Sequence, residues 1–417
     1  MRTALVGLTP GGARRAAAED SLDELAGLAE AAGAVVVYQL LQERARPDSA
    51  TFIGSGKLGI LRAACDEMAV DLVVFDNELS PAQARNVENA LDCRVVDRTQ
   101  LILDIFARRA RTREGKLQVE LAQLKYLLPR LVGAGTMLSR LGGGIGTRGP
   151  GETKLETDRR RIRHRVAALT RELAEVTRRR GHLRERRRQG DAPSVALVGY
   201  TNAGKTTLFN RLAREEAQAS DALFVTLDPL VRRVRLGDGP FLFLSDTVGF
   251  IERLPHTLVA SFRATLEEVV EADLLLHVVE ASSEDRDRRM QAVRQVLAEV
   301  GAEDVPVLLV LNKCDRVDPV DRQRLLAEHP GAVVVSALTG EGVEALTGAM
   351  AARLSLDTEH VTLEFDVGLA ADRARIAWLY RVARVISHRT EGTRAALEVD
   401  VARRWLDRLA GPAPDQG

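Results

Sequence analysis

The chain has 417 residues, which is too long for one ordinary domain, and 45% of its residues are apolar, enough to build buried cores. Its 59 lysine and arginine residues balance its 59 aspartate and glutamate residues, so net charge by itself selects no class of partner. The length predicts about two to four domains. No apolar run approaches the ~20 residues of a membrane span, so none is expected. Because no signal peptide is visible and the three cysteines lack metal-ligand spacing, we expect a cytoplasmic protein.

The first 97 residues alternate apolar and amphipathic stretches. We predict strands at 4–8, 35–41, 72–75 and 95–96, and helices at 22–32, 58–68 and 81–91. Near-continuous apolar strands between helices are typical of a small parallel sheet, so residues 1–97 are expected to form an N-terminal α/β subdomain. Residues 53–57 resemble a second nucleotide loop, but they lack its full spacing and we interpret them as a turn that enters a helix.

Residues 98–190 carry two long helical patterns. Leucines recur at spacings of four and three in the first pattern, and apolar residues do so in the second: Leu117, Leu121, Leu124, Leu128 and Leu131, then Ile162, Val166, Leu169, Leu173, Val176 and Leu183. This spacing places the apolar residues on one face of each helix, where they form a seam that packs against another helix. Because a loop separates the two segments, we expect them to pair as an antiparallel helical hairpin.

The loop between these helices is rich in glycine, with six glycines among the eleven residues from Leu141 to Gly151. Such a segment cannot bury a core, so it either stays disordered or is shaped by a ligand. The helix after it is strongly basic, because residues 152–190 contain fourteen Lys/Arg against six Asp/Glu. Clusters at 159–161, 178–180 and 186–188 could form a merely solvated face. Beside a glycine loop they favour RNA phosphates, contacted through backbone and shape because aromatic residues are few.

A complete phosphate-binding loop, Gly-Tyr-Thr-Asn-Ala-Gly-Lys-Thr, spans Gly199–Thr206 between an apolar strand at 194–198 and a helix-like stretch at 207–212. Glycines let the backbone wrap a phosphate, and the loop amides and helix dipole face the anion. Lys205 is placed to reach the β- and γ-phosphates and Thr206 to bind Mg²⁺. The alternative is a glycine-rich turn that binds nothing. The nucleotide-binding residues predicted here are Gly199, Tyr200, Thr201, Asn202, Ala203, Gly204, Lys205, Thr206 and Thr207.

Two elements of a nucleotide switch follow. Strand 242–245 ends in Asp246-Thr247-Val248-Gly249, where Asp246 can hold Mg²⁺ through water and the Gly249 amide can contact the γ-phosphate. A threonine must also close over the metal, and we choose Thr226 because its segment has no clear helical or strand period. An ordinary loop threonine is the alternative. The predicted catalytic residues are Lys205, Thr226 and Gly249, and the predicted metal ligands are Thr206, Thr226 and Asp246.

Phe250 occupies the position at which many such enzymes place a glutamine that orients the attacking water. Phenylalanine cannot hydrogen-bond water. Either Phe250 packs into the core and another group orients the water, or an outside partner completes the site, which is the interpretation we favour. Asn202, inside the loop, could also coordinate a K⁺ ion near the phosphates.

Two further strand ends predict recognition of guanine. Strand 307–311 runs into Asn312-Lys313-Cys314-Asp315, and the Asp315 carboxylate matches the two donors on the guanine edge, which adenine lacks. Strand 333–335 runs into Ser336-Ala337, where a backbone amide could meet the guanine O6. Ligands bind at the carboxyl ends of strands in open α/β sheets, and all these motifs lie there. Residues 191–356 are therefore predicted to form a P-loop GTPase domain.

Residues 357–417 predict a small α+β C-terminal domain, with strands at 361–367 and 395–401 and helices at 371–386 and 402–410. No chemistry is visible there. The predicted architecture is α/β throughout its main parts: a small parallel N-terminal domain with a helical hairpin, a central P-loop GTPase domain and this appendage.

The whole chain resembles the HflX family of ribosome-associated GTPases. The resemblance rests on Gly151–Arg160, on Phe-Val-Thr-Leu-Asp-Pro at 224–229 and on Asp-Thr-Val-Gly-Phe at 246–250. It implies Mg²⁺ as cofactor, GTP and GDP as ligands, and a hydrophobic residue in place of the catalytic glutamine. It also implies that Asn312, Lys313 and Asp315 hold guanine. The glycine loop would then reach ribosomal RNA of the 50S subunit. An ATP-dependent activity ascribed to the N-terminal domain of some members has no supporting loop in this sequence.

Two hypotheses on function stay open. The first is a GTP-gated factor that binds the large ribosomal subunit, dissociates stalled or idle 70S ribosomes and hydrolyses GTP when the ribosome stimulates it. The second is a GTP-regulated adaptor that binds a protein partner through its coiled-coil hairpin. For either one we expect a monomer, cytoplasmic and, in the first case, associated with ribosomes.

Overall fold

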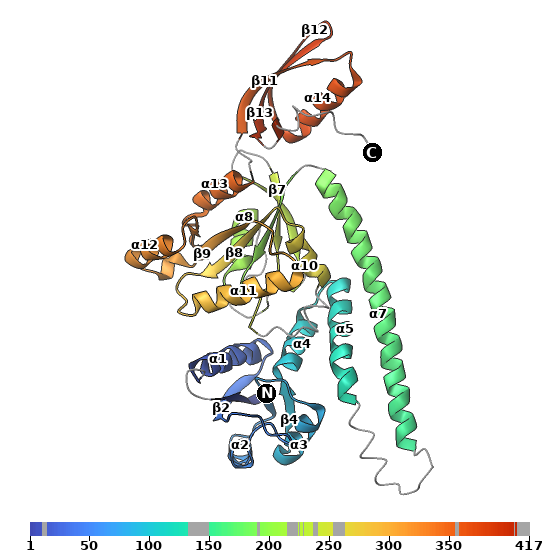
Figure 1. Ribbon diagram of the computed structural model, residues 1–417, viewed down its shortest axis with the longest axis vertical. Helices are drawn as coiled ribbons and strands as arrows, with labels where there is room; N and C mark the ends of the chain where they lie inside the picture. Colours follow the sequence, from blue (N-terminus) through green and yellow to red (C-terminus); the bar gives the residue numbers. More distant parts are fainter. Residues whose placement is uncertain are drawn as a thin grey trace. The chain divides into compact units, whose positions relative to one another are not determined.

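A computed structural model describes residues 1–10, 15–131, 150–189, 192–214, 224, 226–227, 229–236, 241–252, 263–354, 358–403 and 405–406 (Figure 1). The chain divides into two compact units. The first comprises Met1–Arg179, Ser220–Asp228 and Arg253–Ala264, and the second comprises Arg180–Ala219, Pro229–Glu252 and Thr265–Gly417. Most of the glycine loop, residues 141–149, lies outside the described residues.

The first unit contains a parallel sheet, which confirms the predicted fold class of the N-terminal part. Its described strands pair in the order β2-β1-β3-β4: β1 (Arg2–Thr9), β2 (Val35–Glu43), β3 (Leu72–Phe75) and β4 (Arg94–Asp97). Helices α1 (Arg15–Ala31), α2 (Ser55–Glu67) and α3 (Pro81–Leu91) connect them. All four residues of β3 are buried, as a central parallel strand requires.

Two helices follow β4, where the sequence shows one uninterrupted helical pattern. Helix α4 (Arg98–Arg109) is capped by Asp97, and α5 (Arg113–Arg130) is capped by Thr112, whose hydroxyl accepts a hydrogen bond from Gly115 N at 3.0 Å. These two caps supply the start signals that the apolar period alone does not contain. Helix α7 (Pro150–Gln189) returns beside α5 (Figure 1).

The apolar seam between α5 and α7 is filled from within the chain. Leu117, Leu121, Leu169 and Leu173 form its buried cluster, and Leu124 and Val166 pack against that cluster. Residues later in α5 meet residues earlier in α7, so the hairpin is antiparallel. Arg165 donates two hydrogen bonds to the Glu120 carboxylate at 2.7 and 2.8 Å across the same interface. Four predicted seam positions neither belong to this cluster nor pack against it: Leu128, Leu131, Ile162 and Val176. The side chain of Leu183, also predicted in the seam, is not among those described.

The second unit contains a larger sheet with one antiparallel edge. Its described strands pair in the order β10-β9-β8-β5-β7-β6, and all neighbours are parallel except β6 and β7. The strands are β5 (Ser194–Val198), β6 (Leu230–Arg235), β7 (Phe241–Asp246), β8 (Leu274–Glu280), β9 (Val307–Asn312) and β10 (Val333–Val334). The helices are α8 (Lys205–Ala213), α10 (Arg263–Val270), α11 (Arg286–Val300), α12 (Pro319–Glu328) and α13 (Val343–Arg353). Register places Val198 beside His277, and Glu280 beside Asn312, so the carboxyl ends of β5, β8 and β9 share one edge.

The C-terminal part of this unit is a three-stranded antiparallel sheet among the described residues, in the order β11-β13-β12. Its elements are β11 (Thr358–Asp366), α14 (Ala370–Val382), β12 (Arg384–Glu391) and β13 (Arg394–Ala402). The helix predicted to run to Ile386 is too long, because α14 ends at Val382 and the next residues enter β12. Gly392, with φ of 63°, closes the hairpin that pairs β12 with β13.

Candidate nucleotide-binding site

The phosphate-binding loop joins β5 to α8, and two of its glycines are sterically required. Gly199 and Gly204 have φ angles of 151° and 89°. A Cβ atom on Gly199 would lie 2.2 Å from the Val278 carbonyl oxygen, and one on Gly204 would lie 2.2 Å from Asn312 Nδ2. Helix α8 begins directly after Gly204, so its first amides face the loop. The loop therefore has the close-approach backbone and the helix N-terminus that bind phosphate.

Lys205 is held inside this loop. Its Nζ donates to the carbonyl oxygens of Gly199 at 3.0 Å and Tyr200 at 2.8 Å, and the residue is 6% exposed. Burial lowers the pKa of Lys205 to about 8, and the nearby Asp246 carboxylate opposes that shift. An ammonium group in such a place gains strongly from a phosphate that replaces its lost hydration.

Thr206 and Asp246 bring two oxygen donors together beside the start of α8. The Thr206 hydroxyl donates to Asp246 Oδ2 at 2.8 Å, and Asp246 is fully buried. Next to it, Thr247 donates to the Leu197 carbonyl oxygen at 2.5 Å and ties the end of β7 to β5. A hydroxyl and a carboxylate are hard ligands that suit Mg²⁺. Thr226 is buried and belongs to the first unit, so its part in a metal site stays a prediction.

The residues after β7 lie on the phosphate-binding loop. Phe250 O accepts from Thr201 N at 2.7 Å, and Phe250 N donates to Gly199 O at 3.1 Å. A Cβ on Gly249 would lie 2.8 Å from Thr201 Cγ2 and 3.1 Å from Lys205 Nζ, so only glycine fits there. The Phe250 side chain is 1% exposed. Phe250 therefore packs in the core, and no polar side chain stands at the position where a water-orienting group is expected.

Asn312 braces the phosphate loop against the loop after β10. Its Nδ2 donates to Ala203 O at 2.8 Å, and its Oδ1 accepts from Ala337 N at 2.9 Å. The residue is 1% exposed. Its side chain thus joins two loops, a role that the motif does not reveal. A backbone amide of Ser336-Ala337 is expected at the guanine O6. The Ala337 amide donates to Asn312, and a contact of this segment with a base stays a prediction.

Asp315 is exposed and oriented by one neighbour. Its Oδ1 accepts from the Ser336 hydroxyl at 2.6 Å, and Ser336 Oγ in turn accepts from Thr339 N at 3.1 Å. Lys313 forms an ion pair with Glu280 at 3.0 Å. Sequence reasoning missed Glu280, although its place at the carboxyl end of β8 is the signal that could have identified it.

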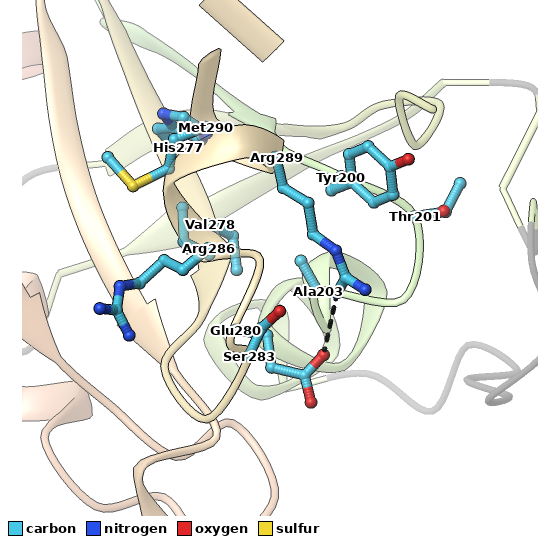
Figure 2. A pocket seen from close by; sticks show the side chains of 11 residues that line it. Tyr200, Thr201, Ala203, His277, Val278, Glu280, Ser283, Arg286, Arg289 and Met290 are labelled. Atoms are coloured by element: carbon cyan, nitrogen blue, oxygen red, sulfur yellow. Dashed lines mark ion pairs between the residues drawn. The ribbon is translucent and has the colours of Figure 1, made fainter. Parts of the chain in front are cut away.

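A small pocket lies beside the phosphate loop (Figure 2). Tyr200, Thr201 and Ala203 line it from the loop, and residues of β8 and α11 line it from the other side. Among them His277 is 3% exposed, and burial lowers its pKa to about 4, so its imidazole is neutral near pH 7. The Arg289 guanidinium lies 5.3 Å from the centre of the Tyr200 ring. The sequence analysis predicted neither this pocket nor the residues of β8 and α11 that line it.

Among the described residues, no helix has the length and apolarity needed to cross a membrane.

Four family models match consecutive parts of the chain. They are described as GTP-binding GTPase N-terminal (residues 19–107), GTP-binding GTPase Middle Region (109–187), 50S ribosome-binding GTPase (194–313) and HflX C-terminal domain (323–408). The chain is 49% identical over 347 residues to GTPase HflX of Caldanaerobacter subterraneus, covering 83% of this chain and 80% of the relative. It is 47% identical over 348 residues to GTPase HflX of Escherichia coli, covering 82% and 81%. A GTP-binding protein of Sulfolobus solfataricus in complex with GDP aligns with a TM-score of 0.45 at 24% identity, over 85% of this chain and 99% of that protein.

Proposed function

Because this chain belongs to the HflX family of GTPases and hydrolyses GTP, we propose that it binds the large ribosomal subunit and dissociates stalled or idle 70S ribosomes in a GTP-dependent manner. Hydrolysis is stimulated by the ribosome and returns the protein to a form that releases it. In this proposal the protein acts as a cytoplasmic monomer. Its functional parts are the subdomain at 1–97, the hairpin at 98–190, the GTPase domain at 191–356 and the C-terminal domain at 357–417.

The observation that carries this proposal is the exposed basic face of α7. Arg160, Arg163 and Arg178 are exposed and form no ion pair with any described residue. The opposite, apolar face of the same helix is already covered by α5. The buried leucines of this helix already pack within the chain, which leaves Ile162 and Val176 as its half-buried seam positions. The guanidinium groups that form no ion pair with described residues are better suited to RNA phosphates than to a coiled-coil partner. This contrast favours the ribosome over the adaptor hypothesis.

The family description of residues 194–313, a 50S ribosome-binding GTPase, supports the same partner. The glycine segment begins ten residues after Leu131 and leads into the first turn of α7, and we propose that it contacts ribosomal RNA. Few aromatic side chains accompany α7, so these contacts involve the backbone and shape of the RNA rather than stacked bases.

Within the GTPase domain we propose a division of labour among the residues described above. Lys205 and the loop amides bind the phosphates, and Thr206, Thr226 and, through water, Asp246 hold Mg²⁺. Mg²⁺ held by these residues would neutralise negative charge on the phosphates. The Gly249 amide contacts the γ-phosphate, and Asp315 selects guanine over adenine through two hydrogen bonds.

Ribosome stimulation follows from the residue at position 250. The buried Phe250 side chain can neither donate nor accept a hydrogen bond, so orienting the attacking water falls to another group. We propose that contact with the large subunit supplies or positions that group. If the isolated chain hydrolysed GTP rapidly and 50S subunits left the rate unchanged, this part of the proposal would be wrong.

Binding is tested by titrating purified 50S subunits over a range of KCl concentrations. In the double variant Arg160→Ala/Arg163→Ala the affinity should fall, and the slope of log K against log salt should decrease by about 2, roughly one per lost phosphate contact. Arg46→Ala/Arg62→Ala removes the same charge from exposed positions elsewhere in the first unit and serves as the matched control. Equal slopes for both variants would refute the RNA contact.

Dissociation is tested separately by sucrose-gradient sedimentation of 70S ribosomes with the protein and a non-hydrolysable GTP analogue. The 70S peak should be converted into 50S and 30S peaks only when the analogue is present. If the 70S peak persists while GTP is still hydrolysed, and 50S binding is also absent, the adaptor hypothesis replaces this proposal.

A further inference from the structure

Three side chains hold the segment after Gly249 onto the phosphate-binding loop, and the scheme above does not use their side-chain contacts. The Tyr200 hydroxyl accepts a hydrogen bond from Glu252 N at 2.9 Å. The Glu252 carboxylate accepts from Arg288 Nη2 at 2.7 Å and also from Arg288 Nε. Tyr200 lies in the phosphate loop, Glu252 follows β7, and Arg288 lies on α11, so the three link separate elements of the second unit.

This cluster adds to the two backbone hydrogen bonds that join Phe250 to Gly199 and Thr201. Residues 250 and 252 are therefore attached to three consecutive residues of the phosphate loop. Tyr200 is 9% exposed, and Figure 2 shows Arg289 extending from α11 past the Tyr200 ring. The ring cannot turn away without losing that contact.

The consequence concerns Gly249, which immediately precedes the attached residues. A Cβ at Gly249 would lie 3.1 Å from Lys205 Nζ, so the backbone of Gly249 already lies beside the ammonium that is expected to reach the γ-phosphate. The Thr201 amide donates its hydrogen bond to the carbonyl oxygen of Phe250, the residue directly after Gly249. The attachment thus holds Gly249 at the edge of the site where the third phosphate would lie.

We propose that Tyr200, Glu252 and Arg288 are positioning residues that preset the Gly249 amide for the γ-phosphate of GTP. A group held in its bound place loses less freedom when the ligand arrives, so the contact costs less than one made by a free loop. GDP lacks the γ-phosphate and gains nothing from this arrangement. The three residues therefore set the preference of the site for GTP over GDP, independently of any ribosome contact.

The test compares Tyr200→Phe, which removes only the hydroxyl, and Arg288→Ala, which removes the support of Glu252. Tyr200→Phe removes the hydrogen bond from Glu252 N, and Arg288→Ala removes both hydrogen bonds that Arg288 donates to Glu252. Each variant should bind a non-hydrolysable GTP analogue about 3- to 10-fold more weakly, and bind GDP within about twofold of the unmodified chain. Arg294→Ala is the control, because it removes an exposed arginine from the same helix.

General damage to the loop would weaken GDP and the GTP analogue alike, and that outcome would overturn the proposal. A tighter affinity for the analogue would also overturn it, because it would mean that the cluster opposes the γ-phosphate. Glu252→Gln gives a second reading: it keeps the shape of the side chain but weakens the bond to Arg288, and its effect should lie between the control and Arg288→Ala.

Discussion

Loss of Asp97 should strongly destabilise part of the first unit, because its buried carboxylate joins β4 to α4, to Leu79 and to α5. It is the last residue of β4 and is 2% exposed. It accepts hydrogen bonds from Gln100 N at 2.9 Å, Leu79 N at 3.2 Å, the Tyr126 hydroxyl at 2.7 Å and Arg130 Nη2 at 2.9 Å. Tyr126 and Arg130 lie at the distal end of α5, beyond the leucine seam with α7.

The magnitude for Asp97→Ala follows from what each partner loses. The helix cap at Gln100 alone is worth about 1 kcal/mol. Removing one member of a buried ion pair costs about 3–5 kcal/mol, because the other charge is left without compensation. Arg130 is 22% exposed and can turn partly toward water, so the lower end applies. We expect the local opening free energy to fall by about 3 kcal/mol.

Hydrogen exchange measured on peptides of the full chain reads this local change, which a single melting temperature of a multidomain protein would not. Peptides covering β4 and the end of α5 should exchange roughly 100-fold faster in Asp97→Ala, since ~1.4 kcal/mol corresponds to a factor of ten. Peptides of β11–β13 should be unchanged. Glu120→Gln is the control, because it breaks an exposed ion pair with Arg165 on the same α5 helix and should cost under about 1 kcal/mol.

Two results would refute this reasoning. An effect near tenfold would mean that only the helix cap at α4 matters and that Tyr126 and Arg130 contribute nothing. An effect no larger than that of Glu120→Gln would mean that the carboxylate does not hold α5 at all.

The remaining predictions concern the nucleotide site. Burial lowers the pKa of Lys205 to about 8, and phosphate binding needs its ammonium form, so GDP affinity should be nearly constant below that pH and fall about tenfold per pH unit above it. Calorimetry in buffers of different ionisation enthalpy should show that GDP binding takes up a proton near pH 9. A GDP affinity that does not change with pH would contradict this prediction. Gly204→Ala should weaken fluorescent GDP binding about 100-fold or more through its φ of 89° and the clash with Asn312, whereas Gly348→Ala, with nothing within 4 Å, should not. Asp315→Asn should shift preference from GTP towards xanthosine triphosphate, and unaltered GTP affinity would exclude Asp315 as the base-reading residue. If Asn202 coordinates K⁺ near the phosphates, GTP hydrolysis should be faster in KCl than in NaCl. Equal rates of GTP hydrolysis in the two salts would exclude this role of Asn202.

The sequence predicted well those elements whose local residue pattern indicates whether they are buried and where they end. The buried run of β3, helix α3 and the strand ends at Val198 and Asp246 all carry their signal in the local sequence. Strand β12 could not be predicted in this way, because Arg384–Glu391 is a mostly polar edge strand whose pairing with β13 gives it structure. The helix expected there ran too far because nothing in the local pattern marks its end at Val382.

The same limit applies inside the site. Motif reasoning predicted that Lys205, Thr206 and Asp246 act together, because each follows a strand end on one edge of the sheet. It could not predict the hydrogen bond from Glu252 N to the Tyr200 hydroxyl or the ion pair between Glu280 and Lys313. Each of these contacts joins residues that are far apart in the chain, and no motif contains both partners.

Asn312 shows why base recognition and phosphate binding in this protein cannot be treated as separate functions. It belongs by sequence to the motif that ends in Asp315, the residue proposed to select guanine, yet its amide group forms hydrogen bonds with Ala203 of the phosphate loop and with Ala337 of the loop after β10. The same amide nitrogen fills the space that a side chain on Gly204 would need. Asn312 is buried, and both its Nδ2 and its Oδ1 are engaged in hydrogen bonds. A displacement of the loop at Ala203 would therefore disturb the loop at Ala337, and the reverse. The shape of the phosphate loop therefore depends on the loops that follow β9 and β10, and we expect a substitution at Asn312 to weaken phosphate binding and base binding together.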